Sequence, residues 1–319
     1  MHAPHMVRAA TLERVRRVMK DSSYVYNATA GDFSRRRSTV IGVLILSTTT
    51  KVAASLSAAQ KLATERDFPL IVCTSGFNAE LERAYLQQFL ERSVAGVLVI
   101  GHMRENLGKI REIQERGVPC LFLWDVLPGT NDSYVGFDNV QGSFAMVDHL
   151  IKQGHERIGF ICSINTGVDR IYKRYLGYQK ALQVNGLPLD PALVRPATST
   201  YANGKAAMQD LMALPEPPRC VCCASDVLAV GAMAAVWEKG LSVPGDFAVV
   251  GFDNSELSGF TPPPLSTVDV PGEEMGRLGM EALLDLIGKE GHPPIQKELP
   301  TSLVLRASSC PASRQNRRE

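Results

Sequence analysis

The chain has 319 residues, with 34 lysines and arginines against 33 aspartates and glutamates, and 45% of it is hydrophobic. This length suggests about two domains, and balanced charge at ordinary apolar content excludes a disordered or polyanion-coating protein. No apolar run approaches the roughly 18 residues of a membrane-spanning helix, and the first residues lack the pattern of a secretory signal. We therefore expect a cytoplasmic protein without a membrane partner.

The predicted elements alternate along the chain between short β-rich runs and longer segments with helical spacing of apolar residues. Strands are expected at residues 41–46, 70–73, 96–100, 119–123, 158–161, 220–223 and 247–251. Helices are expected between them, at residues 53–66, 81–92, 141–152, 173–184 and 228–239. This alternation is typical of α/β folds with parallel sheets. There are too many strands for one ordinary sheet, so we expect two lobes.

Charge is distributed unevenly. Residues 1–40 hold eight basic and three acidic side chains, residues 314–319 hold three basic and one acidic, and the rest of the chain is mildly acidic. A basic N-terminal arm could be attracted to a phosphate backbone, or it could simply be solvated.

The sequence carries no recognisable catalytic or metal-binding motif. We find no GxSxG elbow, P-loop, GxGxxG or HExxH pattern, and we expect no enzymatic activity and no cofactor. Seven cysteines are an odd number, and most lie in strand-like runs, so we interpret them as reduced core thiols. The run from Cys220 to Cys223 contains a CxxC without a second pair, so no metal site is expected.

Three groups of motifs point to one family. Residues 135–142 read VGFDNVQG and lead to HLIKQGHERI at 149–158, and residues 174–182 read RYLGYQKAL. The third group is CASDVLA at 223–229, GLSVPGD at 240–246, VVGFDN at 249–254 and PLSTV at 264–268. In order and spacing across residues 41–306, these motifs resemble the lactose and galactose repressor (LacI/GalR) family of bacterial transcription regulators.

The resemblance implies a core similar to periplasmic sugar-binding proteins. It would have two Rossmann-like lobes joined by three crossover strands, with a small effector in the cleft between them. The core would span residues 39–310, followed by a basic tail at 311–319. One lobe would take about residues 40–155 and 268–294, and the other about 156–267 and 295–306. Open parallel sheets bind ligands at the carboxyl ends of their strands, which agrees with such a cleft.

The first 38 residues resemble only part of the family's DNA-binding headpiece. Residues 11–20 are similar to its third helix and residues 27–38 to its hinge, while the two preceding helices, the helix-turn-helix, are not in this sequence. The resemblance implies hinge contacts to DNA from Asn27, Ala30, Phe33, Arg35 and Arg36. Gly31 and Asp32 disfavour a helix and a phosphate contact, so a loosely helical arm without DNA contacts stays an alternative.

The resemblance also implies an effector site. Its contacts would come from Arg170, Arg174, Tyr201, Ser225, Asp226 and Asp253. Arg174 offers a rigid donor fork, although an amphipathic helix could also carry it at the surface. Asp253 could accept hydrogen bonds from ligand hydroxyls, but its spacing to Glu256 is also that of a capping box.

The remaining effector contacts also have alternatives. Ser225 and Asp226 could equally cap a helix, and Tyr201 could stack on a sugar ring or simply pack. If Lys51, Arg170, Lys173 and Arg174 converge, the cleft would be basic and would favour a sugar acid or sugar phosphate; otherwise these charges are solvated.

These observations favour a transcriptional regulator, most simply a repressor, that binds a small sugar-like effector and operator DNA as a homodimer. The alternative is a cytosolic sugar-sensing protein that has lost DNA binding. A periplasmic binding protein would need an export signal, and an enzyme on this architecture has only fold-level analogy in its favour.

Overall fold

The computed structural model describes residues 8–22, 38–163, 167–289 and 291–309. It forms two units, Met1–Thr39 and Val40–Glu319. In the first unit the described chain is one amphipathic helix, α1 (Ala9–Asp21), at the place where the sequence resembles the third headpiece helix. The hinge positions Asn27, Ala30, Phe33, Arg35 and Arg36 lie outside the described residues.

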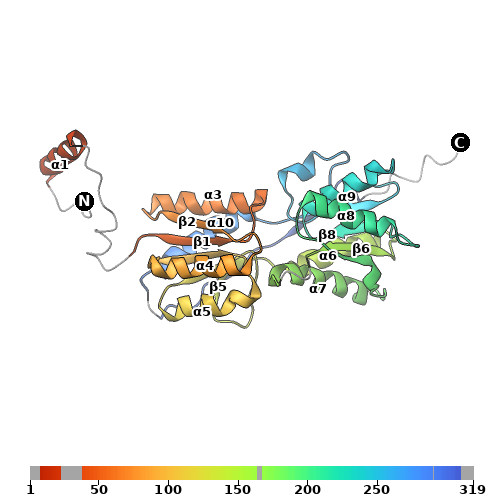
Figure 1. Ribbon diagram of the computed structural model, residues 1–319, viewed down its shortest axis with the longest axis horizontal. Coiled ribbons are helices and arrows are strands. Elements are labelled where there is room, and N and C mark those ends of the chain that lie inside the picture. The colour runs from red at the N-terminus through yellow and green to blue at the C-terminus, as the bar shows by residue number, and fades with distance from the viewer. Residues whose placement is uncertain (1–7, 23–37, 164–166, 290, 310–319) are drawn as a thin grey trace. The chain divides into compact units, whose positions relative to one another are not determined.

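The second unit begins with a six-stranded parallel sheet in the order β11-β5-β4-β3-β1-β2. Its strands are β1 (Ile41–Ile45), β2 (Leu70–Thr74), β3 (Gly96–Ile100), β4 (Cys120–Leu123), β5 (Ser133–Gly136) and β11 (Gln296–Glu298). Helices α3 (Thr50–Glu65) and α10 (Gly272–Leu286) cover one face, and α4 (Ala79–Glu91) and α5 (Leu107–Glu115) cover the other (Figure 1). These elements form the first lobe.

The second lobe has a four-stranded parallel sheet in the order β7-β6-β8-β9. Its strands are β6 (Ile158–Cys162), β7 (Val194–Pro196), β8 (Cys220–Cys223) and β9 (Ala248–Val250). Helices α6 (Asn139–Lys152) and α7 (Asp169–Val184) pack together on one face, and α8 (Tyr201–Met212) and α9 (Asp226–Glu238) pack on the other.

Two of the connections between the lobes pair with each other. Strands β10 (Thr267–Asp269) and β12 (Ser302–Val304) form a two-stranded antiparallel sheet. Single bridges join Val250 to Ser266 and Asp253 to Asp269. The crossover segments are therefore tied to the end of the second sheet.

The lobe boundaries differ from the expected ones at two places. Helix α6 packs on α7 and β8, so the chain enters the second lobe before Asn139 and not near residue 155. Strand β11 pairs with β5, so residues 296–298 belong to the first sheet and not to the second lobe. Because β11 is an exposed edge strand with the sequence QKE, no apolar pattern marks it.

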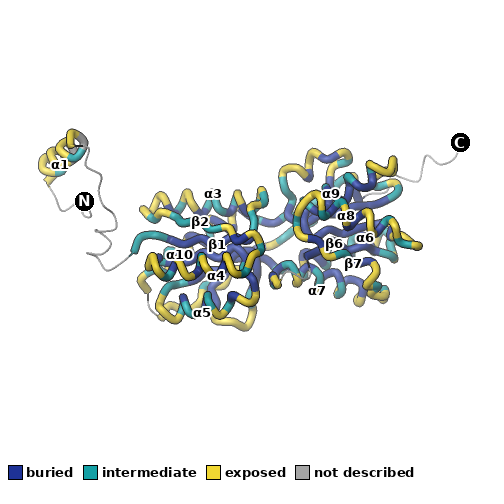
Figure 2. The backbone as a smooth tube through the Cα atoms, in the orientation of Figure 1, coloured by how far each residue is buried: buried dark blue, intermediate teal, exposed yellow. Residues whose placement is uncertain are grey.

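The expected α/β fold with parallel sheets is confirmed, and all seven predicted strands are present. Central strands such as β1 (IGVLI) and β3 (GVLVI) are buried throughout, which explains their continuous apolar runs (Figure 2). The five predicted helices begin two to four residues before the ranges expected from apolar spacing, and all but α7 begin after a residue whose side chain caps the helix. For example, Asp138 accepts bonds from Val140 N and Gln141 N, and Ser225 accepts one from Leu228 N.

Within the described residues, no helix combines the length and apolar character that a membrane span requires. The six described cysteines are unbonded to one another, and all but Cys73 are buried. Burial raises the pKa of each of these thiols, and the five buried cysteines are core side chains, as expected. No group of three potential metal ligands occurs in the described part of the chain.

Candidate functional site

A cleft between the two lobes collects most of the predicted effector contacts. The first lobe contributes Ser47, Thr49 and Val52 after β1, Phe77 after β2 and Trp124 after β4. The second lobe contributes Arg170 and Arg174 from α7, Ser225 after β8 and Asp253 after β9, among others. These positions follow the carboxyl ends of parallel strands, where this kind of sheet binds ligands.

Arg174 is almost fully buried at the centre of this cleft and is held from several sides. Its Nε donates to Asn139 Oδ1 at 2.9 Å, and its NH1 donates to the carbonyl of Ala224 at 2.5 Å. Its guanidinium carbon lies 3.8 Å from the centre of the Phe252 ring. NH1 also lies 3.4 Å from Asp253 Oδ1. Arg174 is therefore a fixed cationic group of the cleft and not a surface arginine.

Asp253 faces Arg174 from a strained loop. Its φ is 112° and that of Asn254 is 52°, and both lie in the left-handed region that non-glycine residues avoid. Its contact with Arg174 lacks hydrogen-bond geometry, so the buried Oδ1 has no hydrogen-bond partner among the described residues. Burial raises the pKa of Asp253, while Arg174, Arg170 and Lys51 oppose that shift. Such strain is typical of a binding site, where it fixes a side chain toward a ligand.

The capping-box alternative for Asp253 is wrong. The following element is a short 3₁₀ helix, Glu256–Gly259, whose cap position is Ser255 and which has no side-chain cap. The backbone N–H of Asp253 donates instead to Val268 O at 2.9 Å. The backbone of Asp253 is therefore bound to a crossover strand, and its carboxylate faces Arg174.

Asp226 holds the loop that carries Asp253 in place through two hydrogen bonds. Its Oδ2 accepts from the Ser255 N–H and its Oδ1 from the Thr267 hydroxyl, both at 2.6 Å. Ser225 caps α9 and shares a 2.7 Å hydrogen bond with Ser199. Both carboxylate oxygens of Asp226 are thus occupied within the protein. We assign it the positioning of the Asp253 loop, whereas the Ser225 hydroxyl borders the cleft itself.

The Asp226 carboxyl gives a pH-dependent prediction. Burial, and to a lesser degree the charge of Asp253, raises its pKa to about 7. Because the folded protein then holds this proton more tightly than the unfolded chain, the contribution of Asp226 to stability falls as pH rises from about 4 to about 7. We expect wild type to lose on the order of 2 kcal/mol relative to Asp226→Asn across this range.

Urea unfolding of both proteins at several pH values checks this expectation. Asp210→Asn, the same change on an exposed side chain of α8, is the control. A stability difference between wild type and Asp226→Asn that does not vary with pH would contradict the assignment.

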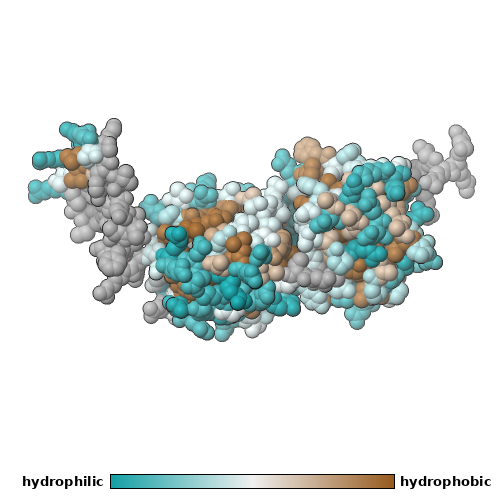
Figure 3. All heavy atoms as spheres, viewed as in Figure 1, coloured by the Kyte–Doolittle hydropathy of each residue, from teal (hydrophilic) through white to brown (hydrophobic). Residues whose placement is uncertain are grey.

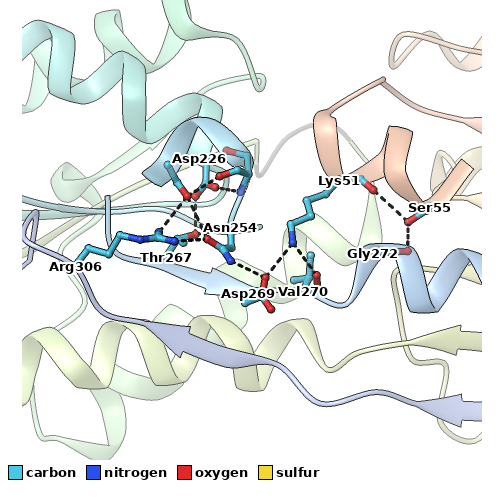
Figure 4. A network of polar contacts seen from close by, with 11 residues as sticks. Lys51, Ser55, Asp226, Asn254, Thr267, Asp269, Val270, Gly272 and Arg306 are labelled. Carbon is cyan, nitrogen blue, oxygen red and sulfur yellow. Dashed lines mark hydrogen bonds and ion pairs between the residues drawn. The ribbon is translucent and has the colours of Figure 1, made fainter. Parts of the chain in front are cut away.

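A polar network continues from Asp226 across the crossover strands (Figure 4). Asn254 Nδ2 donates to Asp269 Oδ1 at 2.9 Å, and Arg306 NH2 donates to Asn254 Oδ1 at 2.8 Å. Lys51, from the start of α3 in the first lobe, reaches the same Asp269 oxygen at 3.0 Å. The loop that carries Asp253 is therefore connected through Asp269 to the first lobe.

The predicted basic cluster is largely neutralised. Lys51 pairs with Asp269, Lys173 donates to Asp125 Oδ2 at 2.7 Å, and Arg174 faces Asp253. Arg170 alone among these four has no ion pair in the described residues. Tyr201 is half-exposed at the start of α8 and borders a neighbouring hollow with Lys51, Asp226 and Asp253.

Trp124 is a cleft residue that sequence reasoning missed. It is 2% exposed, has a φ of 75°, and its indole Nε1 has no hydrogen-bond partner in the described structure. The Arg170 guanidinium carbon lies 5.6 Å from the centre of its ring. In the sequence it is a tryptophan directly after an apolar strand. That pattern is equally typical of core packing, so it did not mark Trp124 as a binding residue.

Comparison with known proteins decides the family. A family model described as a periplasmic binding protein-like domain matches residues 147–309. Over 317 residues the chain is 32% identical to the HTH-type transcriptional regulator CelR of Thermobifida fusca, covering 95% of this chain and 90% of that protein. The chain belongs to the LacI family of transcriptional regulators.

Other relatives agree with this LacI-family assignment. The HTH-type transcriptional repressor CytR of Escherichia coli is 28% identical over 96% of this chain and 89% of its own length. The solved structure of a CelR–cellobiose complex matches with a TM-score of 0.75 at 31% identity, over 95% of this chain and 91% of that one. These relatives are regulators of transcription and not enzymes, which confirms the expectation from the missing catalytic motifs.

Proposed function

We propose that this LacI-family protein is an effector-responsive repressor that acts in the cytoplasm. It binds a sugar-type molecule in the cleft between its lobes and operator DNA as a homodimer. The observation that carries the proposal is the cleft itself, in which Arg174 and Asp253, both more than nine-tenths buried, meet between two parallel sheets. No catalytic nucleophile or base is needed for such a site to work.

The cleft suits a polyhydroxylated ligand. Asp253 Oδ1 lacks a hydrogen-bond partner and can accept from a hydroxyl, while arginine side chains donate. Phe77 and Trp124 border the same space, and aromatic faces pack against the C–H side of a sugar ring. The relative CelR has been solved with cellobiose, which supports a sugar-type effector here.

Ion pairs across the cleft offer a way to couple effector binding to the lobes. Lys173 of α7 bonds Asp125 Oδ2 and Val126 O of the first lobe, each at 2.7 Å. Arg104 pairs with Asp169 at the start of α7 at 2.6 Å. A ligand seated beside α7 would bias these contacts, and a lobe shift would then change affinity at a second site.

An apolar sheet edge supports the homodimer. Strand β2 lies at the edge of the first sheet, and its Val72 is 42% exposed. Figure 3 shows apolar residues gathered near this edge on the visible face of the first lobe. A sheet edge offers unpaired backbone groups with which another chain can pair, and a second copy of this chain would also present two DNA-binding arms to a two-fold symmetric operator.

The test is selection of bound fragments from the organism's own genome by the full-length chain, followed by affinity measurements over a salt series. We expect Arg35→Gln combined with Arg36→Gln to reduce the slope of log K against log salt by about 4, because the dimer loses two phosphate contacts from each of its two arms. The same change at Arg66 and Arg92, two exposed arginines of the first lobe, should leave the slope unchanged.

The chain could instead bind a sugar but show no preference for any genomic fragment over scrambled DNA. This result would contradict the repressor function and favour the alternative, a sugar-sensing protein without DNA binding. Sedimentation of the full-length chain decides between monomer and dimer in the same samples.

A further inference from the structure

Two hydrogen-bond donors that border the cleft have no acceptor among the described residues. Trp124 Nε1 and Arg170 NH1 are both buried and both lack a partner in the described structure. Their side chains are 2% and 9% exposed, and the guanidinium carbon of Arg170 lies 5.6 Å from the centre of the Trp124 ring. A buried donor without an acceptor is unfavourable, and more so when it is charged, so a ligand that accepts hydrogen bonds from these two groups would be favoured here.

The charge of the cleft is also unbalanced. Among the side chains that border the cleft, Arg170 and Arg174 are positive and Asp253 is negative, which leaves one excess positive charge. Lys173 and Asp125 neutralise each other nearby. Burial and the charge of Arg174 lower the pKa of Arg170 to about 10, which still leaves the guanidinium charged at neutral pH. One negative charge on a ligand would restore the balance.

The opposite requirement holds beside Arg174. Asp253 Oδ1 is a buried acceptor without a hydrogen-bond donor, and Ser225 contributes a hydroxyl to the same cleft. A ligand that fills the cleft must therefore accept hydrogen bonds from Trp124 and Arg170 and donate one to Asp253.

We propose that the effector is a polyhydroxylated monocarboxylate, a sugar acid, whose carboxylate binds Trp124 Nε1 and Arg170 while its hydroxyls reach Asp253. This inference rests on the proposed function, since it names the ligand class of the same cleft. A single carboxylate matches one excess charge and supplies two acceptor oxygens for two donors. A phosphate dianion would leave the cleft with excess negative charge, and a neutral sugar would leave Arg170 uncompensated.

Matched pairs of ligands test the proposal. The full-length protein is titrated, by calorimetry and thermal unfolding, with galacturonate against galactose, glucuronate against glucose, and gluconate against sorbitol. In each pair only the carboxylate is replaced by a neutral group. Glucose 6-phosphate provides the dianionic arm. We expect the tightest member to be a carboxylate, at least about tenfold tighter than its neutral partner, because it alone makes the charged hydrogen bonds.

Two variants locate the carboxylate. Arg170→Met should weaken binding of the tightest carboxylate ligand by roughly 10-fold to 100-fold. Trp124→Phe, which keeps an aromatic ring and removes the N–H, should weaken it by roughly 3-fold to 10-fold. Both variants should reduce the difference in affinity between the carboxylate ligand and its neutral partner. The matched controls are Trp237→Phe in α9 and Arg66→Met on the surface of the first lobe, which should leave binding unchanged.

The outcomes separate this inference from the function. If a neutral sugar binds as tightly as its carboxylate partner, or if glucose 6-phosphate binds tightest, the inference is overturned while the regulator with a sugar effector stands. Carboxylate binding that survives both variants also overturns it. If no member of the panel binds, the sugar-acid inference fails, and only operator selection then decides whether the proposed function survives.

Discussion

Replacing Arg174 with methionine is expected to lower the free energy of unfolding by about 3–5 kcal/mol, the usual cost of removing one partner from a buried ion pair. The guanidinium bonds Asn139 and Ala224, covers the Phe252 ring and faces Asp253. Methionine fills similar space but leaves the Asp253 carboxylate buried without its nearest cation. Effector binding should be lost in the same variant.

A double-mutant cycle shows whether the charge is the cause. Adding Asp253→Asn to Arg174→Met should recover about 1–3 kcal/mol, because the stranded carboxylate disappears. Urea unfolding of the four proteins at pH 7 gives the coupling energy. Strictly additive effects would show that Arg174 acts through packing alone and would contradict a stabilising ion pair between Arg174 and Asp253.

Replacing Gly276 with alanine should cost about 3 kcal/mol through overpacking. Gly276 lies in α10 where this helix crosses α3, and an added Cβ would sit 2.0 Å from the carbonyl oxygen of Ser55. The neighbouring contact explains the tight approach, since the Ser55 hydroxyl donates to the Gly272 carbonyl at 2.6 Å (Figure 4). The two helices must move apart, which disturbs the face of the sheet that they cover together.

Gly108 offers the matched control for this substitution. It also lies in a helix, α5, but it is exposed, and an added Cβ would meet nothing within 4 Å. Alanine there should be neutral or stabilising by up to about 1 kcal/mol, because glycine is the poorer helix former. Equal melting temperatures for Gly276→Ala and wild type would contradict the close α3–α10 packing.

The alternation of strands and helices could be predicted because the central strands are buried on both faces and most of the helices on one. Strands β1, β3 and β8 are continuous apolar runs, and their helices repeat apolar residues at helical spacing. Short polar strands escaped prediction. Strand β11 is held by backbone pairing with β5, to which its side chains contribute no apolar pattern.

The site was predictable only as a set of positions. Family motifs indicated Arg174, Ser225 and Asp253, and the possible basic cluster indicated Arg170. The structure places all four around one cleft, whereas it gives Asp226 a positioning role. Motifs could not show which charges pair, because the partners are distant in the sequence. Lys51 and Asp269, for example, are 218 residues apart.

The sequence by itself determined the fold class, the family and the motif residues at the strand ends, because burial periodicity and local motifs are properties of neighbouring residues. Only the tertiary structure decided which polar groups are satisfied. It pairs Lys51, Lys173 and Arg174 with acidic side chains. It leaves one buried donor each on Arg170 and Trp124 without an acceptor among the described residues. Hydrogen-bond satisfaction depends on where distant segments meet, and that is fixed only when the two lobes pack together.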